Sequence, residues 1–374
     1  MASHSPHPTW NHPLLGADGG TLLRLFGRHP VPPAMAPRVA ALLASAAARA
    51  PLAWLERARV ALAADRLADM PPPLFVLGHW RSGTTHLYNL LSRDPQFAWP
   101  DPIATGLPWN FLFIGRVLRP LLERALPESR LIDNVAVDPD SPQEDEIALA
   151  SMQTLSYYHA LYFPADFGDV FEPGAFPDAA HPSSRRLARR TRRFRHYCRK
   201  LLLQGRGDRL LVKNPIHTGQ VAWLTRVFPN ARFVHIHRSP YVVFESTRNF
   251  YRKLLPAYSY QRYDADAVEP FILDTYPRLY RRMYDDVADL PGDRFVEIGY
   301  DELDRRPLDC LRRVYGRLDL GDFDAVQPRV RDYLDGLRGY RRNPHRFAEA
   351  DLEKVEAAWG EWIARWGYSR PEEG

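Results

Sequence analysis

The chain has 374 residues and a net charge of +5, with 45% hydrophobic and 25% charged residues. This composition is typical of a globular protein and argues against a disordered or fibrous chain. The modest positive excess does not by itself indicate nucleic-acid binding. Two cysteines, Cys198 and Cys310, lie in segments with a helical pattern, which argues against a disulfide framework and favours a reducing cytoplasm. The first residues also lack the basic and apolar regions of a signal peptide.

Residues 1–70 are predicted to form an N-terminal extension. The first half is rich in Pro, His and Gly and is expected to be irregular, whereas residues 36–69 have a helical composition rich in Ala, Leu and Arg. The apolar stretch 40–55 is interrupted by Arg49 and Pro51, so we expect it to be too short and too broken to span a bilayer.

The rest of the chain, residues 71–374, alternates apolar strand-like segments with helical patterns. The predicted strands are 74–77, 209–214, 232–238 and 294–300, and the helices after the last three are 217–228, 240–254 and 301–318. Such alternation predicts an α/β domain, a three-layer parallel sheet flanked by helices. The less regular stretch at about 100–205 is interpreted as a substrate-facing insertion. Ligands of such sheets bind beyond the carboxyl ends of the strands.

The segment Gly78–Thr85 joins the first predicted strand to a helical pattern. Glycines and hydroxyl side chains at the start of a helix form a cradle for an anion, because backbone N–H groups and the helix dipole point to the same place. The spacing is that of a Walker A loop, but Thr84 stands where the lysine should be. This argues against γ-phosphoryl transfer and suits a 5′-phosphate or phosphosulfate. The alternative is a plain strand-to-helix turn.

A second anion site is predicted from Arg238 and Ser246. The arginine ends a predicted strand, and the serine follows eight positions later, about two turns into the next helix. Both side chains are able to face one phosphate. The alternative is a surface salt bridge and an unrelated helix serine.

Taken together, these residues resemble the PAPS-dependent sulfotransferases, in particular a bacterial branch with a P-loop NTPase-like fold. The resemblance rests on Trp80–Thr85, Leu211–Pro215, Val227–Phe233 and Arg238–Pro240, and covers about 74–100 and 209–250. It implies PAPS as the co-substrate, with no metal required.

The resemblance also implies roles for individual residues. Ser82, Gly83, Thr84 and Thr85 would hold the 5′-phosphosulfate together with Arg81; Arg238 and Ser246 would hold the 3′-phosphate. Arg81 and Lys213 would act on the sulfuryl group. Weaker matches place Tyr300 near the adenine and Arg341 at the 3′-phosphate.

The catalytic base is left open between several residues. The acidic cluster 141–146 starts a helical pattern, and Glu144 and Glu146 are the candidates within it. The alternative for these acids is compensation of the helix dipole. His217 and His86 are further candidates, although a lone histidine is more often structural.

Eight arginines crowd a segment in which apolar residues recur at helical spacing: Arg185, Arg186, Arg189, Arg190, Arg192, Arg193, Arg195 and Arg199. This predicts a basic amphipathic helix. It would contact an anionic membrane or an acidic acceptor, or present a solvated face. No zinc or iron motif occurs in the sequence.

The sequence therefore predicts a cytoplasmic sulfotransferase that moves a sulfuryl group to a hydroxyl of a small-molecule, lipid or carbohydrate acceptor. The alternatives are a P-loop kinase or NTPase, which the missing lysine disfavours, and a non-catalytic protein that binds anions or membranes.

Overall fold

The computed structural model divides the chain into two compact units, and each is described by itself. Unit 1 comprises 1–72, 96–212 and 253–265, and unit 2 comprises 73–95, 213–252 and 266–374. The structure describes residues 3–4, 8–9, 12–63, 65–115, 117, 119–124, 139–177, 185–337 and 347–372. The predicted extension and the predicted insertion both fall in unit 1, whereas the boundary at residue 70 stays a prediction.

Unit 2 holds three parallel strands and most of the elements around them. These elements are β2 (Leu74–Leu77), α3 (Thr84–Leu91), η5 (Pro215–Gly219), α11 (Val221–Val227), β5 (Arg232–His237), α12 (Pro240–Tyr258, whose C-terminal end lies in unit 1), α13 (Val268–Val287), β7 (Phe295–Gly299), α14 (Tyr300–Arg305), α15 (Pro307–Arg317), α16 (Phe323–Gly336) and α17 (Glu349–Trp366).

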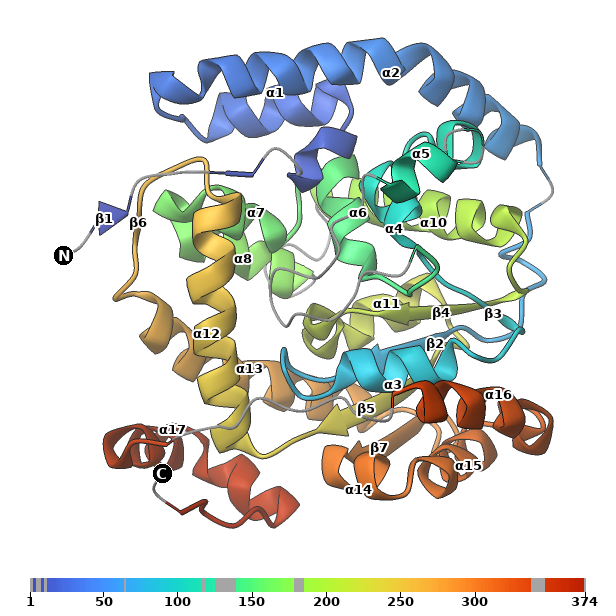
Figure 1. Cartoon of the computed structure of the whole chain (residues 1–374), viewed down its shortest axis with the longest axis vertical. Helices are drawn as coiled ribbons and strands as arrows, with labels where there is room; N and C mark the ends of the chain where they lie inside the picture. Colours follow the sequence, from blue (N-terminus) through green and yellow to red (C-terminus); the bar gives the residue numbers. More distant parts are fainter. Residues whose placement is uncertain are drawn as a thin grey trace. The chain divides into compact units, whose positions relative to one another are not determined.

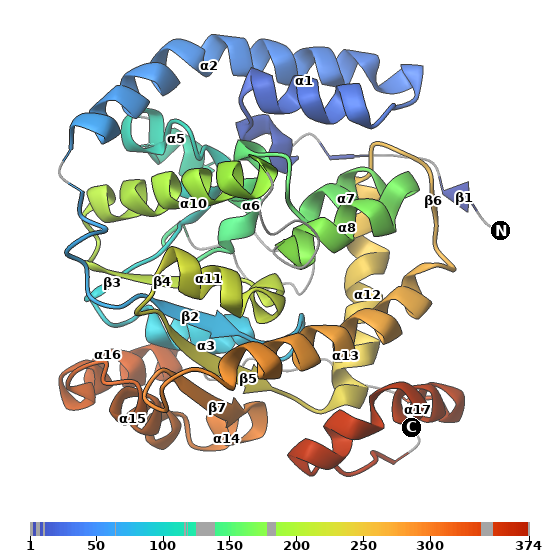
Figure 2. The ribbon, with the colours of Figure 1, turned by 180° about the vertical axis from the view of Figure 1, so that it is seen from behind.

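The strands of unit 2 run β2–β5–β7, all parallel. Helix α3 lies in front of them in Figure 1, and α13 lies in front of them when the molecule is seen from behind in Figure 2. The three predicted layers are therefore present in this unit. The buried run of β2 has no polar face, as expected for a strand covered on both sides.

The register of these strands positions the ends that carry polar residues. Leu77 pairs with His235, and His237 pairs with Gly299. Gly78, Arg238 and Tyr300, which follow directly, therefore gather at one edge of the sheet. Each predicted strand ends within one residue of the observed strand end. Tyr300, which was predicted as the last residue of a strand, is instead the first residue of α14.

The predicted helices differ in their boundaries from those expected. The segment 217–228 begins with the 3-10 turn η5, so that α11 starts at Val221, and α12 continues beyond 254 to Tyr258. The segment 301–318 is two helices rather than one, because the chain turns out of the helical conformation at Arg306, the residue before Pro307. The predicted helix 36–69 ends at Leu62. Pro51, which was expected to break the apolar stretch, lies inside this continuous helix.

Unit 1 is mainly helical. Its elements are β1 (Ser3–His4), η1 (Pro13–Gly16), α1 (Gly19–Arg28), η2 (Pro33–Met35), α2 (Ala36–Leu62), β3 (Phe97–Ala98), α4 (Pro102–Gly106), the π-helical turn η3 (Phe111–Gly115), α5 (Arg119–Arg124), α6 (Asp145–Met152), α7 (Tyr158–Tyr162), η4 (Pro164–Asp166), α8 (Phe167–Ala175), α10 (Arg185–Gln204), β4 (Arg209–Lys213, with Lys213 in unit 2) and β6 (Tyr263–Asp264).

Unit 1 also contains two short strand pairs. Strand β3 pairs with β4 in parallel, and β1 pairs with β6 in antiparallel orientation. The basic helix α10 is amphipathic as predicted, but two of its cations are not on a solvated face. Arg190 is fully buried and bonds both carboxylate oxygens of Glu146, at 3.0 and 3.2 Å. Lys200 is also fully buried, in an ion pair with Glu56 of α2. These pairs fasten α10 to α6 and to α2.

A polar network lies on β5 and β7 of unit 2. Glu297 accepts hydrogen bonds from His235, at 2.8 Å, and from the hydroxyl of Tyr284. Burial alone would raise the pKa of Glu297, but the hydrogen bonds that it accepts from His235 and Tyr284 hold this pKa at about 2. The carboxylate therefore stabilises the folded state when it is ionised.

We expect Glu297→Gln to lower the free energy of unfolding at pH 7 by roughly 1–3 kcal/mol. The folded pKa of Glu297 lies below the ordinary value of 4.5, so its contribution is complete above about pH 5 and is lost as the pH falls toward 2. Urea unfolding between pH 7 and 2.5 should show the wild type converging on the variant. Glu302→Gln removes the same charge from an exposed pair with Arg313 and is the control. A constant difference between wild type and Glu297→Gln across this range would contradict the assignment.

Candidate active site

The turn after β2 has a backbone that favours glycine at both of its ends. Gly78 has φ +146° and Gly83 has φ +97°, and Arg81 between them has φ +70°. A Cβ on Gly78 would lie 2.5 Å from the carbonyl oxygen of Ile236, and one on Gly83 would lie 2.2 Å from Cδ2 of Tyr300. The loop therefore packs against β5 and α14 as closely as the backbone allows. Helix α3 begins at Thr84, directly after Gly83 in the chain.

Two hydroxyl groups from elsewhere in unit 2 hold the start of the loop. The N–H of Gly78 donates to Oγ1 of Thr218 at 2.9 Å, and the N–H of His79 donates to the hydroxyl of Tyr280 at 3.2 Å. Ser82 is fully buried and donates from Oγ to the carbonyl of His79 at 2.8 Å. Thr218 and Tyr280 were not predicted from the sequence. The position of Thr218, five residues after Lys213, was the one available signal.

The predicted second anion site lies directly beside this loop. Nε of Arg81 donates to Oγ of Ser246 at 2.8 Å. The guanidinium of Arg238 lies 4.3 Å from the ring centroid of Tyr300, and its Nη1 is 3.4 Å from the carbonyl oxygen of Arg81. Residues from the loop, β5, α12 and α14 thus meet in one place, although they are separated by more than 200 positions in the chain.

Lys213 reaches the same loop from the end of β4. Its Nζ lies 3.3 Å from Oγ1 of Thr85, and 5.8 Å from the ring centroid of Tyr88 in α3. Lys213 is 2% exposed and Thr84 is 4% exposed, so both act in a poorly solvated setting. A cation, hydroxyl groups and a helix N-terminus converge there, which is an arrangement that stabilises negative charge.

A model of the sulfotransferase family matches residues 72–324, which include the loop, Lys213, Arg238, Ser246 and Tyr300. The chain belongs to the sulfotransferase family. It is a transferase enzyme, and the predicted resemblance to sulfotransferases is confirmed.

Curated relatives and solved structures agree with this assignment. Two relatives, from Mycobacterium bovis and Mycobacterium tuberculosis, are each named omega-hydroxy-beta-dihydromenaquinone-9 sulfotransferase Stf3. Each is 32% identical over 299 residues, which is 80% of this chain and 76% of the relative.

The crystal structure of sulfotransferase STF9 from Mycobacterium avium has a TM-score of 0.63 at 21% identity, covering 86% of this chain and 83% of its own. That of STF1 from Mycobacterium tuberculosis has a TM-score of 0.60 at 16% identity, covering 91% and 90%. These two structures confirm the P-loop-like sulfotransferase fold.

The candidate bases Glu144 and Glu146 belong to unit 1. Glu146 is fully buried in its pair with Arg190, which favours a structural role for this carboxylate. Glu144 is half-buried at the N-terminus of α6, where Oε2 accepts a hydrogen bond from the hydroxyl of Tyr158 at 3.2 Å. Its role as a base stays a prediction.

The candidate histidines belong to unit 2. His217 is fully buried, with Nδ1 3.1 Å from Oε1 of Gln220 and its ring against Phe75. These contacts favour the structural interpretation of this residue. His86 is half-buried in the first turn of α3.

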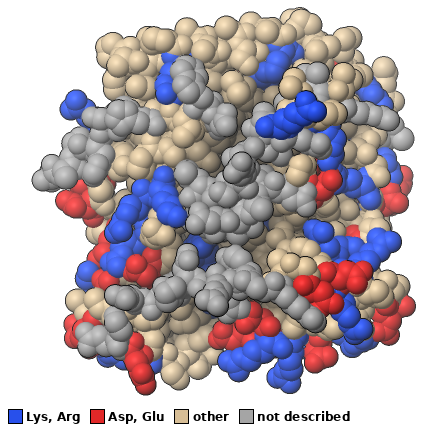
Figure 3. Space-filling view, in the orientation of Figure 1, with Lys and Arg blue, Asp and Glu red and all other residues tan. Residues whose placement is uncertain are grey.

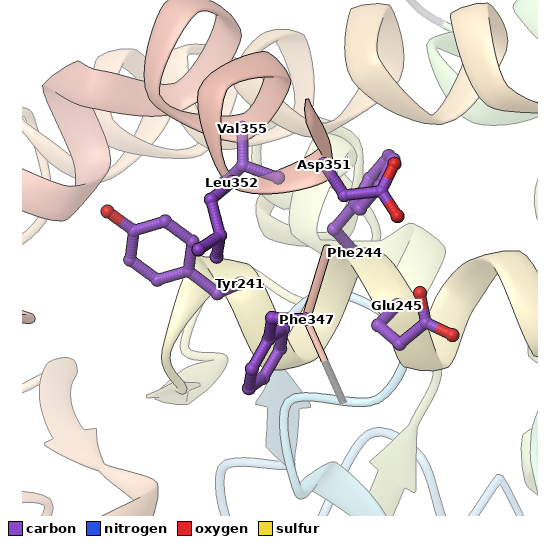
Figure 4. A pocket seen from close by; sticks show the side chains of 7 residues that line it. All are labelled: Tyr241, Phe244, Glu245, Phe347, Asp351, Leu352 and Val355. Carbon is purple, nitrogen blue, oxygen red and sulfur yellow. The ribbon is translucent and has the colours of Figure 1, made fainter. Parts of the chain in front are cut away.

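The predicted Arg341 lies outside the described residues. The chain is described again from Phe347, which lies in a small pocket together with Tyr241 and Phe244 of α12 and Leu352 of α17, shown in Figure 4. Glu245 also lines this pocket and is the immediate neighbour of Ser246. In the part of the chain that the structure describes, no group of three or more His, Cys, Asp or Glu side chains could hold a metal ion.

We expect Gly83→Ala to disrupt the loop, because its Cβ would displace the ring of Tyr300. Gly321→Ala is a matched control, since Gly321 has φ +101° and a Cβ added there would meet nothing within 4 Å. Gly321→Ala should lower the free energy of unfolding by about 1 kcal/mol, from backbone strain alone. Gly83→Ala should lower it by about 1–3 kcal/mol more. Thermal unfolding measures both. Adding Tyr300→Ala to Gly83→Ala should recover part of the extra loss, and equal losses in the two single variants would refute the steric argument.

Proposed function

We propose that this sulfotransferase takes its sulfuryl group from PAPS and transfers it to a hydroxyl of a lipid-like acceptor. The observation that carries the donor assignment is the contact between the two anion sites, Arg81 Nε to Ser246 Oγ at 2.8 Å. A loop that lacks the Walker lysine and lies beside a second cationic site suits a nucleotide with phosphates at two positions.

The residues around the loop fit the nucleotide part of PAPS. The close packing of Gly78 and Gly83 leaves the backbone as the inner wall of the cradle, which suits a phosphate group. Arg238 and Ser246 would hold the 3′-phosphate, and the ring of Tyr300, at the start of α14, would lie near the adenine. Arg341 is retained as a further 3′-phosphate contact by resemblance.

PAPS would supply an activated sulfuryl group: the bond from sulfur to the bridging oxygen breaks as the bond to the acceptor oxygen forms, and adenosine 3′,5′-bisphosphate is released. In this proposal, Lys213 and Arg81 are the cations that stabilise negative charge on the bridging and sulfuryl oxygens, and the burial of Lys213 strengthens its effect. Thr84 and Thr85 bind the 5′ end. The hydroxyl of Ser82 donates to the carbonyl of His79 and shapes the loop, and the contact of Ser82 with the 5′-phosphosulfate stays a prediction.

The acceptor class is proposed from the curated relatives, whose name describes an omega-hydroxylated dihydromenaquinone as the molecule sulfated. At 32% identity over most of the chain, a hydroxylated isoprenoid quinone is the first acceptor to test. Glu144 is our candidate for the base that removes the proton of the acceptor hydroxyl. The two buried, free cysteines support a reducing compartment, and we propose that the enzyme works in the cytoplasm.

Arg238→Ala should lower the affinity for adenosine 3′,5′-bisphosphate about 10–100-fold, because a charged hydrogen bond to a phosphate contributes about 1.5–3 kcal/mol. The affinity for AMP, which has no 3′-phosphate, should fall less than about three-fold. Calorimetry with both nucleotides measures this difference. Arg238→Lys keeps the charge but not the paired N–H donors, and it should fall between wild type and alanine. Equal losses for the two nucleotides would show that Arg238 does not bind the 3′-phosphate.

Lys213→Met should lower kcat about 100–1000-fold while leaving the affinity for adenosine 3′,5′-bisphosphate within a few-fold, because this cation acts on charge that develops during transfer. Sulfated product from a hydroxylated isoprenoid quinone is the readout. Lys354→Met, at an exposed lysine paired with Glu269, is the control. Unchanged turnover by Lys213→Met would show that Lys213 has no role in the transfer.

A further inference from the structure

Helix α2 of unit 1 has an outer face without charge over most of its length. Between Ala36 and Ala58 its exposed positions hold alanine, proline, leucine and tryptophan alone. Among the described residues, the segment Pro33–Leu62 is the one helical segment long and apolar enough to cross a membrane, and 22% of its most apolar window is buried. A helix in a protein core would be mostly buried, so this apolar surface faces outward.

Charged residues within this stretch of α2 point the opposite way, into unit 1. Arg49 donates to the carbonyl oxygens of Leu15 and Ala17, at 2.6 and 2.9 Å. The guanidinium of Arg57 lies 3.9 Å from the ring centroid of Trp109. Glu56 is 1% exposed and pairs with Lys200. Apart from Glu56, the buried residues of α2 are apolar, so both faces of the helix are apolar, whereas an ordinary surface helix directs its charges outward.

The bulkiest exposed side chains gather in the second half of α2. Trp54 is 66% exposed, Leu55 60% and Leu62 88%. Val117 and Leu121, which are also strongly exposed, follow the turn η3, and η3 is joined to α2 by a hydrogen bond from the N–H of Phe113 to Glu56. Large apolar side chains grouped on a surface mark a site that another apolar phase covers.

Positive charge flanks this face. Residues 19–62 contain six arginines, of which Arg24, Arg28 and Arg59 are exposed, and a single acidic residue, the buried Glu56. Figure 3 shows the surface over α1 and α2 at the top of the molecule, with isolated basic side chains and no acidic ones in view. The arginine-rich helix α10 lies beside α2, because Arg199 donates to the carbonyl oxygens of Val60 and Ala63, each at 3.2 Å. An apolar face with a basic rim and an exposed tryptophan matches the headgroup region of an anionic bilayer.

We propose that α2 lies flat in the surface of an anionic membrane, with Trp54, Leu55 and Leu62 inserted among the lipids and arginines of α10 near the headgroups. A spanning orientation would require α2 to leave unit 1, which would break the hydrogen bonds of Arg49 and the buried pair of Glu56 and Lys200. This surface is argued from unit 1 alone and goes beyond the proposed reaction. It would bring the enzyme to the phase in which a lipid acceptor is dissolved.

The test uses the full chain and vesicles of phosphatidylcholine, with or without phosphatidylglycerol, in a sedimentation assay. Wild type should bind the anionic vesicles, and more weakly when the salt rises from about 0.1 to about 0.5 M. Trp54→Ser/Leu55→Ser should bind them about ten-fold or more weakly, because two large apolar side chains no longer insert. Leu337→Ser, at a partly exposed leucine at the end of α16, should bind like wild type.

Calorimetry with adenosine 3′,5′-bisphosphate on each variant separates this proposal from the proposed reaction, since the nucleotide affinity should not change. Failure of wild type to bind anionic vesicles while it still binds the nucleotide overturns the membrane surface and leaves the reaction standing. Equal vesicle binding by wild type and Trp54→Ser/Leu55→Ser also overturns it. So does a wild-type dimer that the double substitution separates without any vesicle binding, because a second copy would then cover α2. Resistance of wild type to alkaline carbonate extraction would overturn the flat orientation and indicate a spanning helix.

Discussion

The site depends on one steric constraint, the tight turn of the backbone from β2 into α3. Because Gly78 and Gly83 leave no room for a Cβ, the loop lies directly against β5 and the ring of Tyr300. That closeness lets Arg238 contact both the loop carbonyl and the same ring. The parallel register of β2, β5 and β7 then brings residues from distant parts of the chain to this turn. A larger residue at either glycine would separate the two anion sites.

In unit 1, the packing of the helices depends on a different interaction, the buried ion pair. Arg190 with Glu146 and Lys200 with Glu56 are removed from water at little or no exposure. Burial lowers the pKa of Lys200 to about 8, although the carboxylate of Glu56 acts to raise it. Such pairs add little net stability compared with apolar packing, but losing one partner is costly. They therefore fix which helices meet, in a unit that has few strands to set the register.

The sequence predicted those features that depend on local rules. Strand ends, the glycine loop, and the placement of Arg238 and Ser246 follow from short-range patterns and from the geometry of parallel sheets, so they could be predicted before the fold was known. The burial of Arg190 could not be predicted, because seven similar arginines surround it and the choice depends on where Glu146 lies. The inward direction of the charges on α2 could not be predicted for the same reason, since Arg49 and Glu56 resemble ordinary surface residues until their partners are known.

The pair of Lys200 and Glu56 also bears on how the chain can be divided. The family match starts at residue 72, but α2 ends before it and supplies the carboxylate that neutralises a lysine within the matched region. A chain trimmed to the family boundary would leave that ammonium group buried without its counter-charge, at a cost of about 3–5 kcal/mol. The region that the family model matches is therefore smaller than the region that must fold together. Glu56 of α2 is the counter-ion of Lys200, so a shortened protein would need a replacement for this carboxylate as well as for the apolar surface of α2.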